Sequence, residues 1–133
     1  GCPNSCGQHH IADIGFFGGA KKVNDRLVPH FQLMLGGFTD EGKAEFGQSI
    51  LKLPARRIPD AVIRMLELYR KERTSTQESF RSFALRVGLP YWKQQLEPFT
   101  TLPDYVATPE AYRDWGAESD FSLGGMGPGE CAA

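Results

Sequence analysis

Two cysteines and two histidines lie within the first ten residues of the chain, in the stretch GCPNSCGQHH. Cys2 and Cys6 are four positions apart. In a helix this spacing places two side chains on one face, with their β-carbons about 5–6 Å apart, so both thiolates could reach one metal ion or cluster. Gly7, directly after the second cysteine, would let the backbone approach a bulky cofactor. The stretch therefore predicts a metal or cluster site.

The same residues are compatible with two kinds of site that need no other cysteine. A mixed tetrahedral zinc site would use both thiols and one imidazole, from His9, His10 or His30. The spacing differs from the C-x2-C and H-x3-5-H pairs typical of structural zinc, and adjacent histidines on a helix point about 100° apart. A redox pair of Cys2 with Cys6 is a further alternative, although the usual spacing of such pairs is C-x-x-C.

A [4Fe–4S] cluster is the third alternative, and it requires four thiolates. The third cysteine of the chain, Cys131, is remote in sequence from the other two. The chain also begins without an initiator methionine. We therefore expect a fragment of a longer protein, in which an upstream segment supplies the remaining thiolates.

Length and composition set limits on the kind of protein. With 133 residues, of which 41% are hydrophobic and 23% charged, the chain has the size and composition of one folded domain. Its formal net charge of -1 predicts no nucleic-acid partner and no attraction to an anionic membrane. No run approaches the roughly 18 apolar residues of a membrane-spanning helix, and no signal-peptide pattern is present. The odd number of cysteines argues against a secreted disulfide scaffold, so we expect the cytoplasm.

The first third of the chain predicts a short helix and two strands. CGQHHIAD, residues 6–13, has no strong breaker after its glycine and predicts a short helix. The segments IGFF and FQLML predict strands, and in the second one Phe31 and Leu33 alternate with Gln32 and Met34. We expect the two strands to pair antiparallel across a polar loop, KKVNDR.

Two helices are predicted further along the chain. The first covers residues 59–73, because a proline suits its first turn and apolar residues recur at the helical period. The second begins at Ser75 and Glu78, whose spacing is that of a capping box. Gly88 and then Pro90 are expected to stop it.

From about Thr100 the sequence is rich in Pro, Gly, Asp and Ser and shows no periodicity. We expect an irregular tail over residues 100–133, anchored to another part of a larger protein by isolated aromatic residues. These residues are Tyr105, Tyr112, Trp115 and Phe121. The predicted fold class is therefore α+β, with a small antiparallel sheet element and two helices in residues 1–99, followed by the tail.

The segment GCPNSCGQHHIADIGFFGG resembles the second cluster-binding segment of the sirohaem-dependent nitrite and sulfite reductases, and the resemblance extends over roughly residues 1–90. That family carries a C-x5-C pair followed by a C-P-N-x-C-G segment, and the four cysteines hold a [4Fe–4S] cluster. The resemblance implies that Cys2 and Cys6 are the third and fourth ligands and that Cys6 also bridges to the sirohaem iron. It places Asn4 in the loop that lies against the sirohaem.

The resemblance also implies what the longer protein does. It would reduce nitrite to ammonia or sulfite to sulfide by six electrons, with ferredoxin as the expected electron donor and a flavoprotein as the alternative. The first cysteine pair and the basic residues that bind the anionic substrate would lie in the missing N-terminal part, so this chain alone is expected to be inactive. It would complete a larger half-domain. Its own Lys52, Arg56 and Arg57 could approach the carboxylates of the sirohaem, although solvation or salt bridges are the more ordinary role of such residues.

Overall fold

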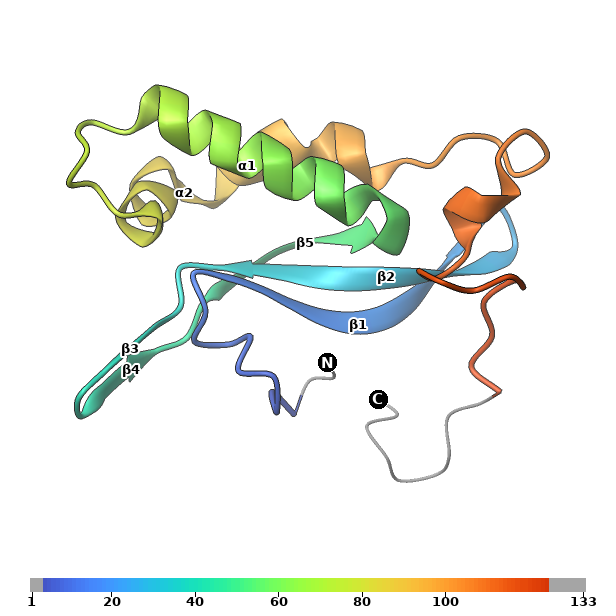
Figure 1. The fold of residues 1–133 in the computed structure, drawn as a ribbon, viewed down its shortest axis with the longest axis horizontal. Helices are drawn as coiled ribbons and strands as arrows, with labels where there is room; N and C mark the ends of the chain where they lie inside the picture. Colours follow the sequence, from blue (N-terminus) through green and yellow to red (C-terminus); the bar gives the residue numbers. More distant parts are fainter. Residues whose placement is uncertain (1–3, 125–133) are drawn as a thin grey trace.

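The computed structural model describes residues 4–124, and its centre is a three-stranded antiparallel sheet with helices packed on one face (Figure 1). The strand order is β1-β2-β5, formed by Ile14–Val23, Arg26–Leu35 and Gln48–Pro54. A hairpin of β3 (Phe38–Asp40) and β4 (Lys43–Glu45) projects from the end of the sheet where β2 ends and β5 begins. The predicted α+β class is confirmed.

The predicted pairing of the first two strands is also confirmed. Phe16 lies opposite Leu33 in the antiparallel register of β1 and β2. The predicted KKVNDR loop is wrong, because both strands continue through it to a two-residue turn. Asn24 and Asp25 form this turn with φ values of 49° and 62°. Short polar side chains tolerate the left-handed conformation that such hairpin turns require.

The first predicted helix is α1 (Ile58–Glu72), which agrees closely with the expectation. The second is α2 (Phe80–Leu96), and it begins later than predicted. Its N-cap is Ser79 rather than Ser75, and the Ser82 N–H donates to Ser79 Oγ at 3.1 Å. Within residues 4–124, no helix has the length and apolar character needed to cross a membrane.

A kink divides α2 where the sequence predicts its end. Gly88 has φ 80° and ψ 171°, and a helical segment containing Pro90 resumes after it. The kink lets Trp92 turn back into the core, where its indole N–H donates to Ala84 O at 3.1 Å. The buried core lies between the sheet and both helices and includes Leu33, Leu35, Ile50, Leu53, Met65, Leu68, Phe83, Trp92 and Leu96.

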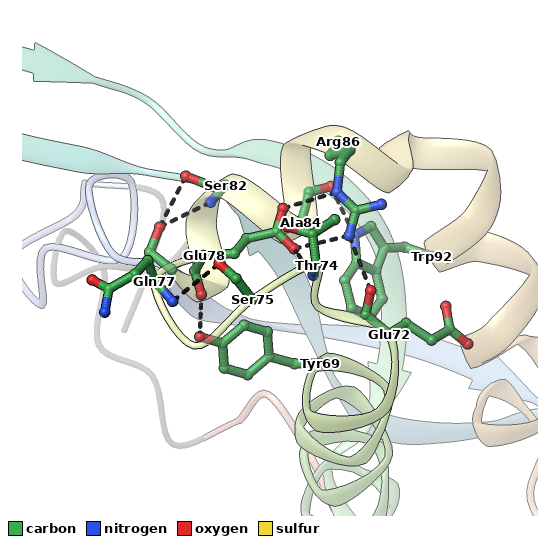
Figure 2. Close-up of polar contacts among 11 residues, drawn as sticks. Tyr69, Glu72, Thr74, Ser75, Gln77, Glu78, Ser82, Ala84, Arg86 and Trp92 are labelled. Atoms are coloured by element: carbon green, nitrogen blue, oxygen red, sulfur yellow. Dashed lines mark hydrogen bonds and ion pairs between the residues drawn. The ribbon is translucent and has the colours of Figure 1, made fainter.

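A network of polar contacts fixes the loop between the two helices (Figure 2). The carboxylate of Glu78 accepts hydrogen bonds from Arg86 Nε and Nη2, both at 2.9 Å, and from the Thr74 N–H at 3.0 Å. Arg86 also donates to the carbonyl oxygen of Glu72 at the end of α1, at 3.1 Å. These contacts, led by those of Arg86, lower the pKa of Glu78 to about 2.

The described part of the tail, residues 100–124, packs against this chain's own sheet and η1, and contact with another part of a larger protein stays a prediction. Tyr112 is buried, with 2% of its surface exposed. The guanidinium of Arg26, beside the β1–β2 turn, lies 3.4 Å from the centroid of the Tyr105 ring. The indole N–H of Trp115 donates to Ala55 O at 2.9 Å, in the short helix η1 (Ala55–Arg57). Aromatic residues do anchor the tail, as predicted.

Glu78→Gln tests the loop network through its pH dependence. A carboxyl whose folded-state pKa is lowered stabilises the fold above its unfolded pKa, near 4.5, and this contribution disappears as the pH falls toward about 2. We therefore expect the variant to be less stable than the parent from about pH 5 to 7, with the difference shrinking between pH 4.5 and 2. Urea unfolding at a series of pH values measures it.

Glu67→Gln is the matched control, because Glu67 is exposed on α1 and its side chain makes no hydrogen bond or ion pair within residues 4–124. A difference between Glu78→Gln and the parent that stays constant down to about pH 2 would contradict the assigned role of the carboxylate.

Candidate functional site

The segment that carries Cys6 runs below the sheet, on the face opposite the helices (Figure 1). The helix predicted for residues 6–13 is wrong, because the segment is a series of turns. Ser5 and Gln8 have φ values of 60° and 57°, and a right-handed helix excludes this left-handed conformation. The Gln8 N–H donates to Ser5 O at 2.8 Å, and the Ile11 N–H donates to Gln8 O at 3.1 Å.

Backbone hydrogen bonds tie this segment to the end of the sheet and to the residue directly before β5. The donors are glycine N–H groups and the acceptors are carbonyl groups of the segment: Gly36 to Asp13 at 3.0 Å, Gly37 to Ala12 at 3.0 Å, and Gly47 to His10 at 2.7 Å. Because each bond joins main chain to main chain, the position of the segment does not depend on side-chain rotamers.

Two glycines allow this contact sterically. A β-carbon on Gly15 would lie 2.0 Å from the carbonyl oxygen of His9, and one on Gly37 would lie 2.5 Å from the carbonyl carbon of Ile11. Both distances are far below van der Waals contact, so any other residue would push the segment away. The local sequence pattern did not indicate this packing role of the two glycines.

Cys6 has an exposed thiol and forms no disulfide. It sits on the turn between the two left-handed residues. A β-carbon added at Gly7, the next residue, would meet no atom within 4 Å beyond its immediate chain neighbours. Asn4 is exposed as well. A soft, accessible thiol on a hydrogen-bonded turn with open space next to it fits the requirements of a ligand to an iron–sulfur cluster. Cys2 and Cys131 lie outside the described residues.

The histidines do not assemble a metal site in the described part of the chain. No group of three or more His, Cys, Asp or Glu residues within residues 4–124 could hold a metal ion. His30 is buried in β2 with Nδ1 3.0 Å from Val28 O, and burial lowers its pKa. His10 is half-buried, with its ring 5.5 Å from that of Phe46. The zinc alternative therefore has no support here.

Two of the three basic residues considered for cofactor carboxylates are engaged within the chain. Arg56 donates from Nε and Nη2 to the carbonyl oxygens of Arg113 and Asp114 in the tail, at 3.1 and 2.9 Å. Arg57 donates to a backbone carbonyl at 3.4 Å. Lys52 is exposed on β5. Only Lys52, among these three, keeps its charge available to an external group.

Comparison with known proteins gives one family and several relatives. The family model of the nitrite and sulphite reductase 4Fe-4S domain matches residues 1–101. An assimilatory ferredoxin-dependent nitrite reductase from Haloferax mediterranei is 26% identical over 115 residues, which are 86% of this chain and 20% of the relative. A sulfite reductase (ferredoxin) from Mycolicibacterium paratuberculosis is 37% identical over 89 residues, 65% of this chain and 16% of the relative.

A solved structure is similar as well. The NirA protein of Mycobacterium tuberculosis superposes with a TM-score of 0.62 at 33% sequence identity, covering 69% of this chain and 17% of that protein. The chain thus spans about a fifth of the length of the curated relatives that it matches.

Gly15→Ala tests the steric contact that positions the Cys6 segment. The added β-carbon would displace the carbonyl of His9, and overpacking of this kind costs about 1–3 kcal/mol. We expect the full-length protein carrying the substitution to unfold at a lower temperature and to retain less iron per chain than the parent.

Gly19→Ala is the matched control on the same strand, because the nearest atom to its β-carbon would lie 3.9 Å away, an ordinary contact. Equal unfolding temperature and iron content in the two variants would show that the contact at Gly15 does not matter.

Proposed function

Because the chain belongs to the nitrite and sulphite reductase 4Fe-4S domain family, we propose that it is the C-terminal part of a sirohaem-dependent reductase of nitrite or sulfite. The observation that carries the proposal is the exposed thiol of Cys6 on a hydrogen-bonded turn, inside the segment that matches the family. The bound cluster and sirohaem would supply the electron chemistry for the six-electron reduction of nitrite to ammonia or of sulfite to sulfide, which no side chain can perform.

Three residues near the start of the chain would hold these groups. Cys2 and Cys6 would each give a thiolate to the [4Fe–4S] cluster, and Cys6 would be shared with the sirohaem iron. The exposure of Cys6 and the open space at Gly7 leave room for a large macrocycle beside the thiol. Asn4 would lie against the sirohaem. The hydrogen-bonded backbone of residues 10–13 would keep the thiolate in one position while the charge of the cluster changes.

Other parts of a longer protein would complete the enzyme. The remaining thiolates and the basic residues that bind the anionic substrate would come from upstream sequence, so this chain alone would be inactive. Ferredoxin appears in the names of both curated relatives described above, which supports ferredoxin as the electron donor. One of these relatives is a nitrite reductase and the other a sulfite reductase, so the proposed substrate is the class that contains both anions. The proposed location is the cytoplasm.

The proposed division of the chain places the cofactor-binding domain in residues 1–99 and a tail in residues 100–133. The match to the family model ends at residue 101, which supports this boundary. The tail would stabilise the domain from outside, since Arg56 and Ala55 bind it through hydrogen bonds.

The full-length gene product tests the proposal. Its sequence should contain a C-x5-C pair upstream of Cys2, and the purified protein should show the absorption bands of sirohaem together with about four iron atoms of the cluster per chain. A full-length protein without sirohaem bands and without acid-labile sulfide would overturn the proposal.

Cys6→Ser in the full-length protein should abolish turnover, because serine oxygen is a poor replacement for a thiolate shared by two iron centres. We expect loss of the spectroscopic coupling between cluster and sirohaem, measured by electron paramagnetic resonance, and loss of nitrite or sulfite reduction. Cys131→Ser is the control and should keep both. Full six-electron activity in Cys6→Ser would exclude the bridging role.

A further inference from the structure

His9 is a buried histidine whose two ring nitrogens both lack a hydrogen-bond partner within the described residues. Only 4% of its surface is exposed. The other buried histidine, His30, has its Nδ1 within hydrogen-bond distance of a backbone carbonyl. Buried polar side-chain atoms in folded proteins nearly always have a partner, and a neutral imidazole offers one N–H donor and one acceptor nitrogen. The unpartnered ring of His9 therefore points to a group that residues 4–124 do not themselves provide.

The position of the ring is fixed by aromatic contacts and by the backbone. The His9 ring lies 5.0 Å from the ring of Phe17 on β1 and 4.4 Å from the ring of His10, measured between centroids. The backbone carbonyl oxygen of His9 occupies the space that a side chain at Gly15 would need. Burial, and then the charge of His10, lower the pKa of His9, which favours the neutral imidazole.

His9 is also close to the proposed cluster ligand in the chain. It lies three positions after Cys6, and three residues of fully extended chain span at most about 10 Å. The hydrogen bond from the Gln8 N–H to Ser5 O folds this stretch back into a turn, which shortens the separation further. The backbone of His9 therefore lies within about 10 Å of the backbone of Cys6, so a bulky cluster bound to the Cys6 thiolate would be a close neighbour of His9.

We propose that His9 donates its ring N–H to a sulfur atom of the [4Fe–4S] cluster held through Cys6, and that this hydrogen bond raises the reduction potential of the cluster. The inference rests on the proposed function. A [4Fe–4S] cluster takes four thiolates, one for each iron, so the imidazole serves as a donor to sulfur rather than as a ligand. Hydrogen bonds to the sulfurs are among the factors that set the potential, because a donor stabilises the extra negative charge of the reduced state.

Substitutions in the full-length holoprotein test this role through the potential of the cluster. His9→Leu removes the donor, and we expect the midpoint potential, measured by a redox titration followed by electron paramagnetic resonance, to become more negative. His9→Gln keeps an N–H donor at similar reach, so its potential should lie between those of His9→Leu and the parent. His10→Leu is the matched control, since this neighbouring imidazole is half-buried, and it should leave the potential unchanged.

Stability of the cofactor-free protein separates this role from a structural one. Because both nitrogens of His9 are unpartnered within residues 4–124, replacing the ring by an apolar side chain should not lower the unfolding temperature of the cofactor-free protein. In the holoprotein the same variant should lose iron to a chelator faster than the parent. A large loss of stability without the cofactor would show that His9 serves the fold, and the proposal would fail.

The outcomes also distinguish this proposal from the function on which it rests. A parent protein that contains no cluster would overturn the proposed function and the role of His9 with it. A parent protein that contains the cluster, and whose potential is the same in His9→Leu, would overturn the role of His9 alone. A potential shift of equal size in His10→Leu would do the same, because the effect would then not be specific to the unpartnered ring.

Discussion

The backbone of residues 9–13 lies directly on the backbone of glycines from the sheet and from the hairpin beside it. No side chain separates the two layers at Gly15 or Gly37, where a β-carbon would come within 2.0 and 2.5 Å of main-chain atoms. The exposed position of Cys6 depends on this contact, because the turn that presents the thiol continues into the packed residues. The burial of His9 depends on it as well, since the His9 carbonyl is the group closest to Gly15.

The two faces of the sheet serve different purposes. On one face, helices α1 and α2 bury the apolar residues of β2 and β5, and this core supplies most of the stability. On the other face lies the Cys6 segment (Figure 1). Several arginines serve the fold itself: Arg56 binds the tail, Arg81 binds the Gly36 carbonyl oxygen and Glu45, and Arg86 binds the loop between the helices. Under the proposed function, these three arginines are therefore not available to bind an anionic substrate.

Local patterns explain which elements could be predicted. The alternation in β2 and the helical period of α1 are regular, and both elements were found where they were predicted. β5 was not predicted, because the adjacent apolar residues Ile50 and Leu51 break the alternation of a half-buried strand. A shift in register between Gln32 and Met34 on β2 accompanies this irregularity. The helix predicted for residues 6–13 was wrong because Gln8 is left-handed and because contacts with distant glycines hold residues 9–13 along a non-helical path.

The sequence by itself determined the fold class, the family and the identity of the residues that could bind a cluster, because these follow from residue types and spacing within short segments. The tertiary structure decided that the Cys6 segment is a series of turns, that Gly15, Gly37 and Gly47 hold it, and that His9 is buried without a hydrogen-bond partner in residues 4–124. Each of these features arises where the chain folds back on itself and backbone meets backbone. Hydrophobic periodicity records which face of an element is buried, but it carries no information about such contacts.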